Sequence, residues 1–177
     1  MPKETAVTKP PSARTRRRVP TDRPVLDELD WRLLARLQSD ARVSTAELAR
    51  QLRLSPPGVQ KRIRRLEEKG VVERYVTVIN REAVGLDLLC FVLIMLAHHR
   101  PDSVRRFRAG IAKMPEVLEC HQLTGEFDCL MKLVVGNHDD LQRFLERLMR
   151  VGGVDRVRTS IVLNEVKSVT ALPLKTK

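Results

Sequence analysis

The segment from Val43 to Gly70 constrains the fold more than any other part of the sequence, because it encodes two short amphipathic helices separated by a turn. Ser44 with Glu47 three positions later is typical of a capping box at a helix start. Ser55 followed by Pro56 is typical of a second start, since proline is tolerated in the first turn. The segment therefore predicts a helix-turn-helix.

Both helices of the pair have an apolar side. The first is expected to bury Ala46, Leu48, Ala49 and Leu52, and the second Val59, Ile63 and Leu66. At about 100° per residue, Lys61, Arg64 and Arg65 point largely away from the apolar sector of the second helix. A helix with one face on a small core and a free basic face is suited to enter the major groove of DNA. A merely solvated basic face is the alternative interpretation.

The flanking segments extend this pattern. Leucines recur at helical spacing from Val25 to Ser39, which predicts another helix before the pair, with Trp31 as a packing residue. Val71 to Asn80 is short and rich in β-branched residues, which predicts a two-stranded wing after the pair. Three helices followed by a hairpin form a winged helix-turn-helix.

The charge of the chain favours a polyanionic partner. Its 177 residues carry a net charge of +11 with a pI near 10.3, which is typical of nucleic-acid-binding proteins. Residues 1–25 have a net charge of +5, residues 26–80 of +3 and residues 81–177 of +3. We expect the proline-rich, arginine-rich segment 1–25 to be a disordered tail that touches phosphates without sequence preference. A solubilising leader is the alternative.

Several other classes of protein are disfavoured. The longest apolar run, Leu88 to Ala97, is about half as long as a membrane span. Cys90, Cys120 and Cys129 lie in apolar, strand-like runs, which predicts buried free thiols and a cytoplasmic protein.

Neither a metal site nor an active site is indicated. Cys120 and His121 are adjacent rather than spaced for metal binding, and His98-His99 lack partners, so no metal or other cofactor is expected. We find no nucleophile–base pair, no paired carboxylates at a useful spacing and no phosphate-binding loop, so we do not expect an enzyme.

The second half of the chain predicts a different fold. After a linker over residues 81–87 we expect five strands, the last of them only a candidate: Leu88–Ala97, Val117–Thr124, Phe127–Val135, Val154–Val166 and Ser168–Leu174. One helix is expected to begin at Pro101, after the first strand, and another to cover residues 141–149, after the third. Gly125 favours a tight hairpin between the middle strands. The order βαββαβ is typical of a ferredoxin-like sheet with both helices on one face, so the fold class is α+β.

The other face of this sheet is predicted to be uncovered and apolar. Alternate residues of Leu88–Ala97 and of Leu130–Val134 must point to it, because side chains alternate across a strand. Burial against a second copy of the chain is the least costly solution, so we expect at least a dimer.

Together these features resemble the leucine-responsive regulatory protein/AsnC family of bacterial and archaeal transcription regulators. The resemblance covers residues 26–167 and is carried by four stretches: LDELDWRLLARLQSDARVSTAELA, LSPPGVQKRIRRLEEKGVV, ECHQLTGEFDCLMKLVV and GGVDRVRTSIVLNEVK. It implies a winged helix-turn-helix joined to an amino-acid-sensing domain. It also implies dimers that assemble into tetramers, octamers or larger particles that wrap DNA, with the effector bound between dimers near Thr124–Asp128.

Two positions depart from the family pattern. Cys129 stands where a tyrosine is common, and Asn137-His138 replaces a more apolar step. These departures weaken any transfer of the identity of the ligand from the family, so leucine is one candidate effector and other branched-chain or polar amino acids remain open.

The candidate DNA-binding residues lie on and around the second helix of the pair. They are Arg42, Arg53, Ser55, Pro57, Gln60, Lys61, Arg62, Arg64 and Arg65. Gln60 and Arg64 are expected to contact bases, with Pro57 and Lys61 as further candidates. Phosphate contacts are expected from the basic tail and from Arg42, Arg53, Lys61 and Arg62. For Arg62 an ion pair with Glu47 or Glu67 inside the domain is the alternative. In a symmetric dimer two such helices would contact a palindromic site with half-sites about one helical turn apart.

The candidate effector residues follow from what a free amino acid offers. Asp128 can pair with its ammonium group, and backbone N–H groups around Gly125 can bind its carboxylate. For Asp128 a turn-stabilising role is the alternative. The other residues expected around the effector are Gln122, Thr124, Glu126, Phe127, His138, Ser160, Ile161 and Val162.

The sequence thus predicts a transcription regulator whose assembly and DNA binding respond to an amino acid. Its predicted domains are a tail over residues 1–25, a winged helix-turn-helix over 26–80, a linker over 81–87 and a ferredoxin-like domain over 88–174. We expect it to work in the cytoplasm of a bacterium or archaeon, on the nucleoid. Two alternatives remain: a nucleoid-organising protein without sequence preference, and a sensor that acts through protein contacts alone.

Overall fold

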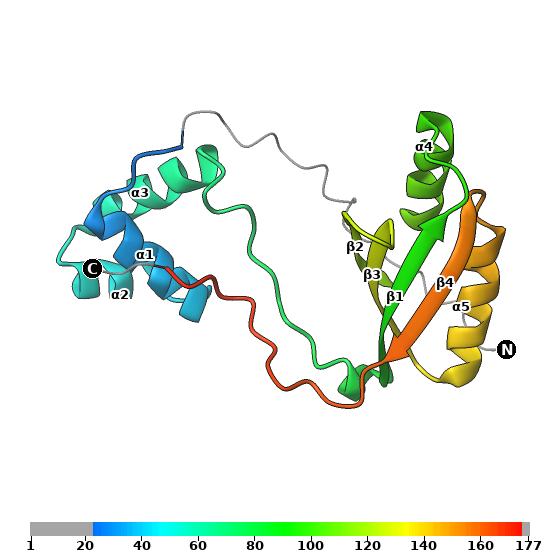
Figure 1. Ribbon diagram of the computed structural model, residues 1–177. Helices are drawn as coiled ribbons and strands as arrows, with labels where there is room; N and C mark the ends of the chain where they lie inside the picture. The colour runs from blue at the N-terminus through cyan, green and yellow to red at the C-terminus, as the bar shows by residue number, and fades with distance from the viewer. Residues whose placement is uncertain (1–22, 175–177) are drawn as a thin grey trace, which may run out of the picture. The chain divides into compact units, whose positions relative to one another are not determined.

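The computed structural model describes residues 23–174, which form two compact units (Figure 1). Residues 23–78 and 167–174 belong to one unit, which we call the helical domain. Residues 79–166 form the other, which we call the sheet domain. Apart from residues 23–25, the predicted basic tail lies outside the described residues.

The helical domain contains three helices: α1 (Glu28–Ser39), α2 (Thr45–Leu52) and α3 (Pro56–Glu68). Ser44 and Ser55 cap α2 and α3 as predicted, since their side-chain oxygens accept from the backbone N–H groups of Glu47 and Gly58. Between them Arg53 adopts a left-handed conformation, with φ of 55°, and this ends α2 and turns the chain into α3.

The capping box expected at α2 is only half formed. The side chain of Glu47 bonds to Arg50 and Gln51 instead of turning back to Ser44. A complete capping box occurs at α1, between Asp27 and Asp30, where each side chain accepts from the backbone N–H of the other.

An apolar core lies between the three helices. Its buried members are Leu33, Leu34, Leu48, Ala49, Leu52, Val59 and Leu66. Trp31 packs partly buried against it, as predicted. Ala46 was expected in the core but is exposed, because it lies on the solvent side of α2.

The predicted two-stranded wing is not formed by the described residues 71–80, which contain no strand. Val71 and Val72 pack against the helical core, and the hydroxyl of Tyr75 donates to Glu67. The β-branched composition correctly indicates an extended backbone. A hairpin also needs a turn, and the stretch from Glu73 to Ile79 has no Gly, Pro, Asn or Asp to supply one.

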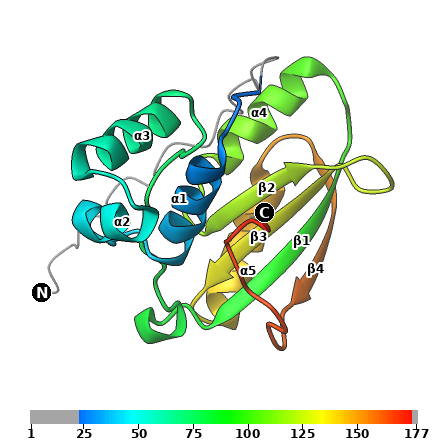
Figure 2. The same ribbon diagram turned by 90° about the vertical axis from the view of Figure 1, so that its left-hand side faces the viewer.

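The sheet domain is an antiparallel sheet with two helices on one face (Figures 1 and 2). Its elements are β1 (Leu88–Leu96), α4 (Pro101–Ile111), β2 (Val117–Gln122), β3 (Cys129–Val135), α5 (His138–Arg150) and β4 (Val154–Ile161), after a short 3₁₀ turn η1 (Glu82–Val84). The strand order is β2-β3-β1-β4, with every neighbouring pair antiparallel. This βαββαβ order confirms the predicted ferredoxin-like fold.

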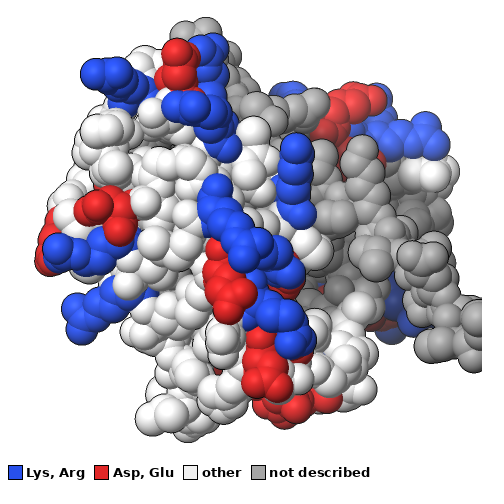
Figure 3. All heavy atoms as spheres, turned by 90° about the vertical axis from the view of Figure 1, so that its right-hand side faces the viewer, with Lys and Arg blue, Asp and Glu red and all other residues white. Residues whose placement is uncertain are grey.

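One face of the sheet is covered by α4 and α5. Alternate residues of β1 and β3, among them Val92 and Met131, are fully buried against Phe107 of α4 and Phe144 of α5. Figure 3 views the helix-bearing side of this domain, where basic and acidic side chains share the surface. None of the described helices is long and apolar enough to span a membrane.

The other face is open along its centre, as the alternation predicts. Phe91 is 37% exposed there, and Leu93 and Leu130 are half-buried opposite each other. Toward β4 this face becomes basic, since Arg156 and Arg158 pair with Met95 and Leu93 of β1. The uncovered face is thus an apolar strip with a basic margin.

Two predicted strand boundaries are wrong. β2 and β3 are joined by the six-residue loop Leu123–Asp128 rather than a two-residue turn, with the N–H of Leu123 donating to the carbonyl of Asp128 at 2.8 Å. The fifth strand at Ser168–Leu174 is not formed. Instead the side chain of Gln38 in α1 exchanges two hydrogen bonds with the backbone of Leu172, and Leu174 packs on the helical core.

Of the three cysteines, all free, only two are buried. Cys90 and Cys129 lie in the core, whereas Cys120 is exposed. Cys120 belongs to β2, an edge strand whose residues are almost all exposed. Apolar neighbours in the sequence therefore led to a wrong prediction that this thiol is buried.

The closest approach of α4 to the end of α5 generates a stability prediction. A Cβ at Gly110 would lie 2.7 Å from Cγ1 of Val151, a stiff β-branched side chain. Gly110→Ala should therefore destabilise the protein by up to about 2 kcal/mol, since crowding costs roughly 1–3 kcal/mol and the gain in helix propensity offsets about 1 kcal/mol. Urea unfolding measures this. In a Val151→Ala background the same substitution should instead stabilise; stabilisation in the unmodified chain would contradict the contact.

Candidate DNA-binding and effector sites

The second helix of the pair, α3, presents a polar face made of predicted DNA-binding residues. Gln60, Lys61 and Arg64 are exposed, whereas Val59 and Leu66 are fully buried on the opposite side. A helix held by its apolar side with arginine, lysine and glutamine outside offers the donors that recognise base edges and phosphates. Pro57 is exposed beside them in the first turn.

Three other candidates surround this helix start. The hydroxyl of Ser55 accepts from the N–H of Gly58 at 3.2 Å and so caps α3. Arg53 in the turn and Arg42 before α2 are exposed and have no carboxylate partner among the described residues. Their guanidinium groups are available to an anion.

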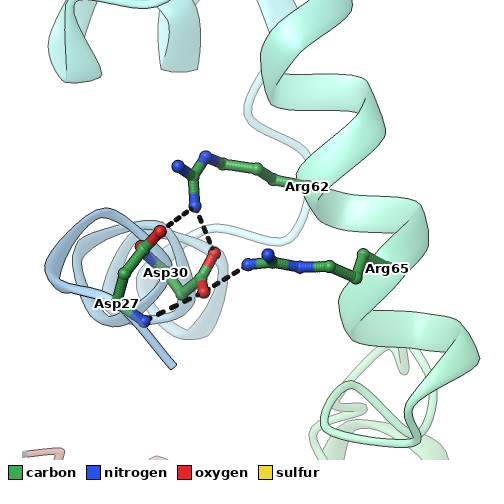
Figure 4. Close-up of polar contacts among 4 residues, drawn as sticks. All are labelled: Asp27, Asp30, Arg62 and Arg65. Atoms are coloured by element: carbon green, nitrogen blue, oxygen red, sulfur yellow. Dashed lines mark hydrogen bonds and ion pairs between the residues drawn. The ribbon is translucent and has the colours of Figure 1, made fainter. Parts of the chain in front are cut away.

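Arg62 and Arg65 are directed inward, toward the start of α1 (Figure 4). Arg62 Nη1 lies 2.6 Å from Oδ2 of Asp27 and 2.8 Å from Oδ1 of Asp30, and Arg65 pairs with the other oxygen of Asp30. Asp30 is completely buried. Arg62 thus forms an ion pair inside the domain, which is the alternative to a DNA contact given above. Its partners are these two aspartates rather than Glu47 or Glu67. The expectation that Arg65 points away from the core is wrong.

The ion pairs change the acidity of their members. The hydrogen bond from Arg62 holds the pKa of Asp27 below its usual range, and Asp27 in turn raises the pKa of Arg62. Asp27 and Arg62 therefore stay charged near neutral pH. We call Asp27, Asp30, Arg62 and Arg65 the α1–α3 ion-pair cluster. Helical periodicity could not reveal it, because it joins residues 32 to 35 positions apart.

In the sheet domain, Asp128 is already engaged within its own chain. Oδ2 accepts from the N–H of Leu96 at 2.7 Å, and Oδ1 lies 2.6 Å from Nε2 of His99. The hydrogen bond from the N–H of Leu96 holds the pKa of Asp128 below its usual value. Partial burial raises this pKa, and the contact with His99 lowers it. Asp128 thus fixes the Leu123–Asp128 loop to the end of β1, as its turn-stabilising alternative supposed. It also remains a charged carboxylate beside the loop.

Two side chains near this loop were not predicted from the sequence. His99 was taken to lack partners, but it contacts Asp128. Arg108 of α4 donates to Oε1 of Gln122 at 2.9 Å, which places a guanidinium beside the loop. Only the strand register could have shown that these segments meet, since Arg108 and Gln122 lie on separate elements.

The predicted effector residues do not form one cluster in a single chain. Thr124, Gly125 and Glu126 are exposed and Phe127 is half-buried in the loop near the end of β1. Ser160 and Ile161 pair with Phe91 and Cys90 near the start of β1.

Six residues of β1 separate Cys90 from Leu96, which amounts to about 20 Å along a strand. The N–H of Val162 donates to the carbonyl of Leu89, at the same distant end as Ile161. His138 begins α5, beyond the far end of β3, and lines an open groove with Leu141, Leu145 and Met149. The preceding Asn137 has a structural role, since it caps α5.

Metal-binding groups are scarce in the part of the chain that the structure describes. Residues 23–174 contain no cluster of three or more His, Cys, Asp or Glu side chains able to hold a metal ion. Cys120 and Cys129 lie close enough for one thiol to hydrogen-bond the other, which raises the pKa of Cys120 and lowers that of Cys129.

Comparisons with known proteins identify both domains. Residues 26–73 match the family model of a winged helix-turn-helix DNA-binding domain, and residues 89–172 match that of the Lrp/AsnC ligand-binding domain. A helix-turn-helix joined to a ligand-binding domain defines a DNA-binding regulator.

Relatives agree over nearly the whole chain. The leucine-responsive regulatory protein of Salmonella typhimurium is 38% identical over 153 residues, which cover 86% of this chain and 93% of that protein. The Escherichia coli K12 protein of the same name is 37% identical over the same span. The chain belongs to the Lrp/AsnC family of transcription regulators, which are not enzymes.

Solved structures support the same assignment. A transcriptional regulator from Neisseria meningitidis, solved in complex with L-methionine, superposes with a TM-score of 0.82 at 34% identity, covering 85% of this chain and 98% of that one. An AsnC family regulator from Agrobacterium tumefaciens gives a TM-score of 0.79 at 30% identity, covering 84% and 97%.

The α1–α3 ion-pair cluster generates a second prediction. Asp30→Asn should lower the free energy of unfolding by roughly 2–3 kcal/mol, because it leaves two arginines without their buried counter-charge. The loss should fall below the 3–5 kcal/mol typical of fully buried pairs, since Arg65 is 42% exposed. Chemical denaturation checks this. The exposed Glu68→Gln removes the same charge without a partner and should be nearly neutral; equal effects would refute a special role for Asp30.

Proposed function

We propose that this regulator binds palindromic DNA sites as a homo-oligomer and that an amino acid bound near the Leu123–Asp128 loop changes its assembly. The observation that carries the DNA-binding part is the polar face of α3, with Gln60 and Arg64 exposed and Val59 buried. Glutamine and arginine are the side chains best suited to bidentate contacts with adenine and guanine.

Different residues serve different parts of this DNA contact. Gln60, Lys61 and Arg64, with Pro57 beside them, face the bases. Arg42 and Arg53 contact phosphates at the edges of the groove. Ser55 orients the start of α3, whose backbone N–H groups favour a phosphate. Arg62 and Arg65 hold the helix in place from behind through the α1–α3 ion-pair cluster.

The open face of the sheet supports self-association. Phe91, Leu93 and Leu130 form an apolar strip that water covers in a single chain. Pairing two such strips buries both, and a two-fold axis presents two copies of α3 to DNA. Tetramers or octamers would multiply this contact, so assembly controls affinity through the number of α3 helices engaged at once.

The effector class is supported by the chemistry at the loop. Asp128 is charged and retains lone pairs that an ammonium group can use, because each carboxylate oxygen accepts more than one hydrogen bond. Arg108 and the backbone around Gly125 supply donors for a carboxylate. The L-methionine complex of the Neisseria meningitidis relative favours a free amino acid for this chain.

A complete effector site requires more than one copy of the chain. Ser160, Ile161, Val162 and His138 lie far from the loop within one subunit. They can surround the same ligand only if a neighbouring subunit brings its own end of the sheet to the loop. Such a site would couple effector binding to assembly directly, since the ligand bridges copies.

A nucleoid-associated role follows from the same properties. A basic chain that assembles on DNA contacts many phosphates, so it also binds nonspecific DNA. The alternative, an architectural protein without sequence preference, would show equal affinity for promoter and random DNA.

The DNA-binding proposal yields a direct test. Gln60→Ala with Arg64→Ala should lower affinity for the preferred site by roughly 30-fold or more, because each of the two lost bidentate base interactions costs about 1–3 kcal/mol, and should leave affinity for random DNA little changed. Gel shifts at physiological salt measure both.

Arg36→Ala in α1 serves as the control in this experiment, since it removes an exposed arginine that is not on α3. Equal affinity for specific and random DNA in the unmodified chain would favour the architectural alternative. Unchanged promoter occupancy by the double variant would favour a sensor that acts through protein contacts.

The effector proposal is tested by calorimetry of the chain against the twenty amino acids. Asp128→Asn keeps an oxygen for the N–H of Leu96 and removes the charge, so it should fold yet bind the preferred amino acid at least about tenfold more weakly. Asp87→Asn, the same substitution at an exposed position outside the loop and outside the candidate effector residues, is the matched control. If no amino acid binds the unmodified chain, sensing fails while DNA binding stands.

A further inference from the structure

The positive charge of the sheet domain is concentrated on one helix and its flanks. Residues 79–166 contain twelve basic and twelve acidic side chains, so the domain has no net charge. Residues 98–113, which include α4, contain five basic residues and one acid, a net charge of +4, and the remainder of the domain therefore carries −4. The five basic residues are Arg100, Arg105, Arg106, Arg108 and Lys113, which we call the α4 basic surface.

Burial places these side chains on one outer surface. Ser103, Phe107 and Ile111 pack inward against the sheet, and all five basic residues are exposed. In Figure 3 blue side chains lie at the top, the end of the domain where α4 lies, with one red group between them.

Few of these charges are neutralised by neighbours. Asp102, the single acid of the segment, pairs with Arg105, whose side chain is still 78% exposed. Arg108 donates to the neutral Gln122. Arg100, Arg106 and Lys113 have no carboxylate within ion-pair distance among residues 23–174.

The neighbouring helix provides the contrast. α5 contains three basic and three acidic residues, and Arg143 and Arg147 pair with Asp140 and Glu116. An ordinary solvated helix of this domain is thus internally neutralised, and α4 is not. Keeping like charges together on one helix costs stability, which a polyanionic partner would restore.

We propose that the α4 basic surface is a second DNA-binding surface, which contacts the phosphates of double-stranded DNA outside the sites that the α3 helices occupy. Guanidinium groups bind phosphate oxygens in a bidentate manner. From Arg100 to Lys113 the segment spans roughly 20 Å at the rise of a helix, enough to follow several phosphates. The aromatic residue of α4, Phe107, is buried, so the surface lacks the stacking platform that single strands require.

The function of this surface would be to hold DNA against the sheet domain. Its contacts carry no sequence information, so they add affinity equally on every sequence and lengthen the DNA segment covered by each assembly. The proposal rests on the DNA binding of the family and does not depend on the effector proposed above.

The test compares two charge-matched variants of the full chain. Arg106→Gln with Lys113→Gln removes two unpaired charges from the α4 basic surface. Arg143→Gln with Arg150→Gln removes two from α5. Affinity for a specific and a random duplex is measured over a range of salt concentrations, together with the length of the DNA footprint.

The α4 variant should flatten the dependence of log K on log salt by about one unit for each phosphate that is no longer bound, about two units per engaged subunit. The decrease should be the same on both duplexes, the footprint should shorten, and preference for the specific site should persist. The α5 variant should change none of these.

Two results would overturn the proposal. One is an unchanged slope and footprint in the α4 variant while circular dichroism shows it folded. The other is an equal change in both variants, which would indicate a general charge effect. If sedimentation shows that the α4 variant instead changes oligomeric state with DNA binding per assembly unchanged, the surface binds an acidic region of a second copy and the DNA proposal is wrong.

Discussion

The second helix of the helix-turn-helix, α3, is held by a carboxylate that water does not reach. Asp30 is completely buried, yet it accepts from the backbone of Asp27 in the capping box of α1 and from Arg62 and Arg65 of α3. One side chain thus caps the first helix and fixes the third. Because the aspartate satisfies several donors together, the angle between α1 and α3 depends on charge as well as on apolar packing. Arg62 and Arg65, two of the predicted DNA-binding residues, form ion pairs that hold the helix that presents Gln60 and Arg64.

The elements of the fold were largely predictable, since they depend on local patterns. Helical and strand periodicity located all five α-helices and the four strands of the described chain, and the βαββαβ order followed from their sequence. The errors concern pairing. The β-branched segment 71–80 indicated a hairpin, but without turn residues it remains a single extended stretch. The segment Ser168–Leu174 resembled a strand, but its partner is Gln38 in α1 rather than a neighbouring strand.

The candidate sites show the same limit more strongly. A helical wheel separates exposed from buried positions, so Gln60, Lys61 and Arg64 were identified correctly as exposed. It says nothing about partners 29 or more residues away, so it does not reveal the counter-ions of Arg62 or the contact between His99 and Asp128. The effector candidates were collected by chemical type and family resemblance. In the structure these candidates lie at opposite ends of β1, because of the register in which the strands pair. A single sequence specifies this register only for two strands that are joined by a turn.

The contact of the C-terminal segment with α1 has a consequence for how the protein is made. Leu172 and Leu174 complete the surface of the helical domain, although the whole sheet domain lies between them and α1 in the sequence. During synthesis the helices emerge from the ribosome first, but these contacts become possible only after the sheet domain has been translated. The N-terminal domain can therefore begin to fold early, but it reaches its final packing only after the sheet domain and the segment that follows it have been synthesised. A nascent or prematurely terminated chain would carry α3 on an incompletely supported domain, which limits DNA binding by unfinished copies of the regulator.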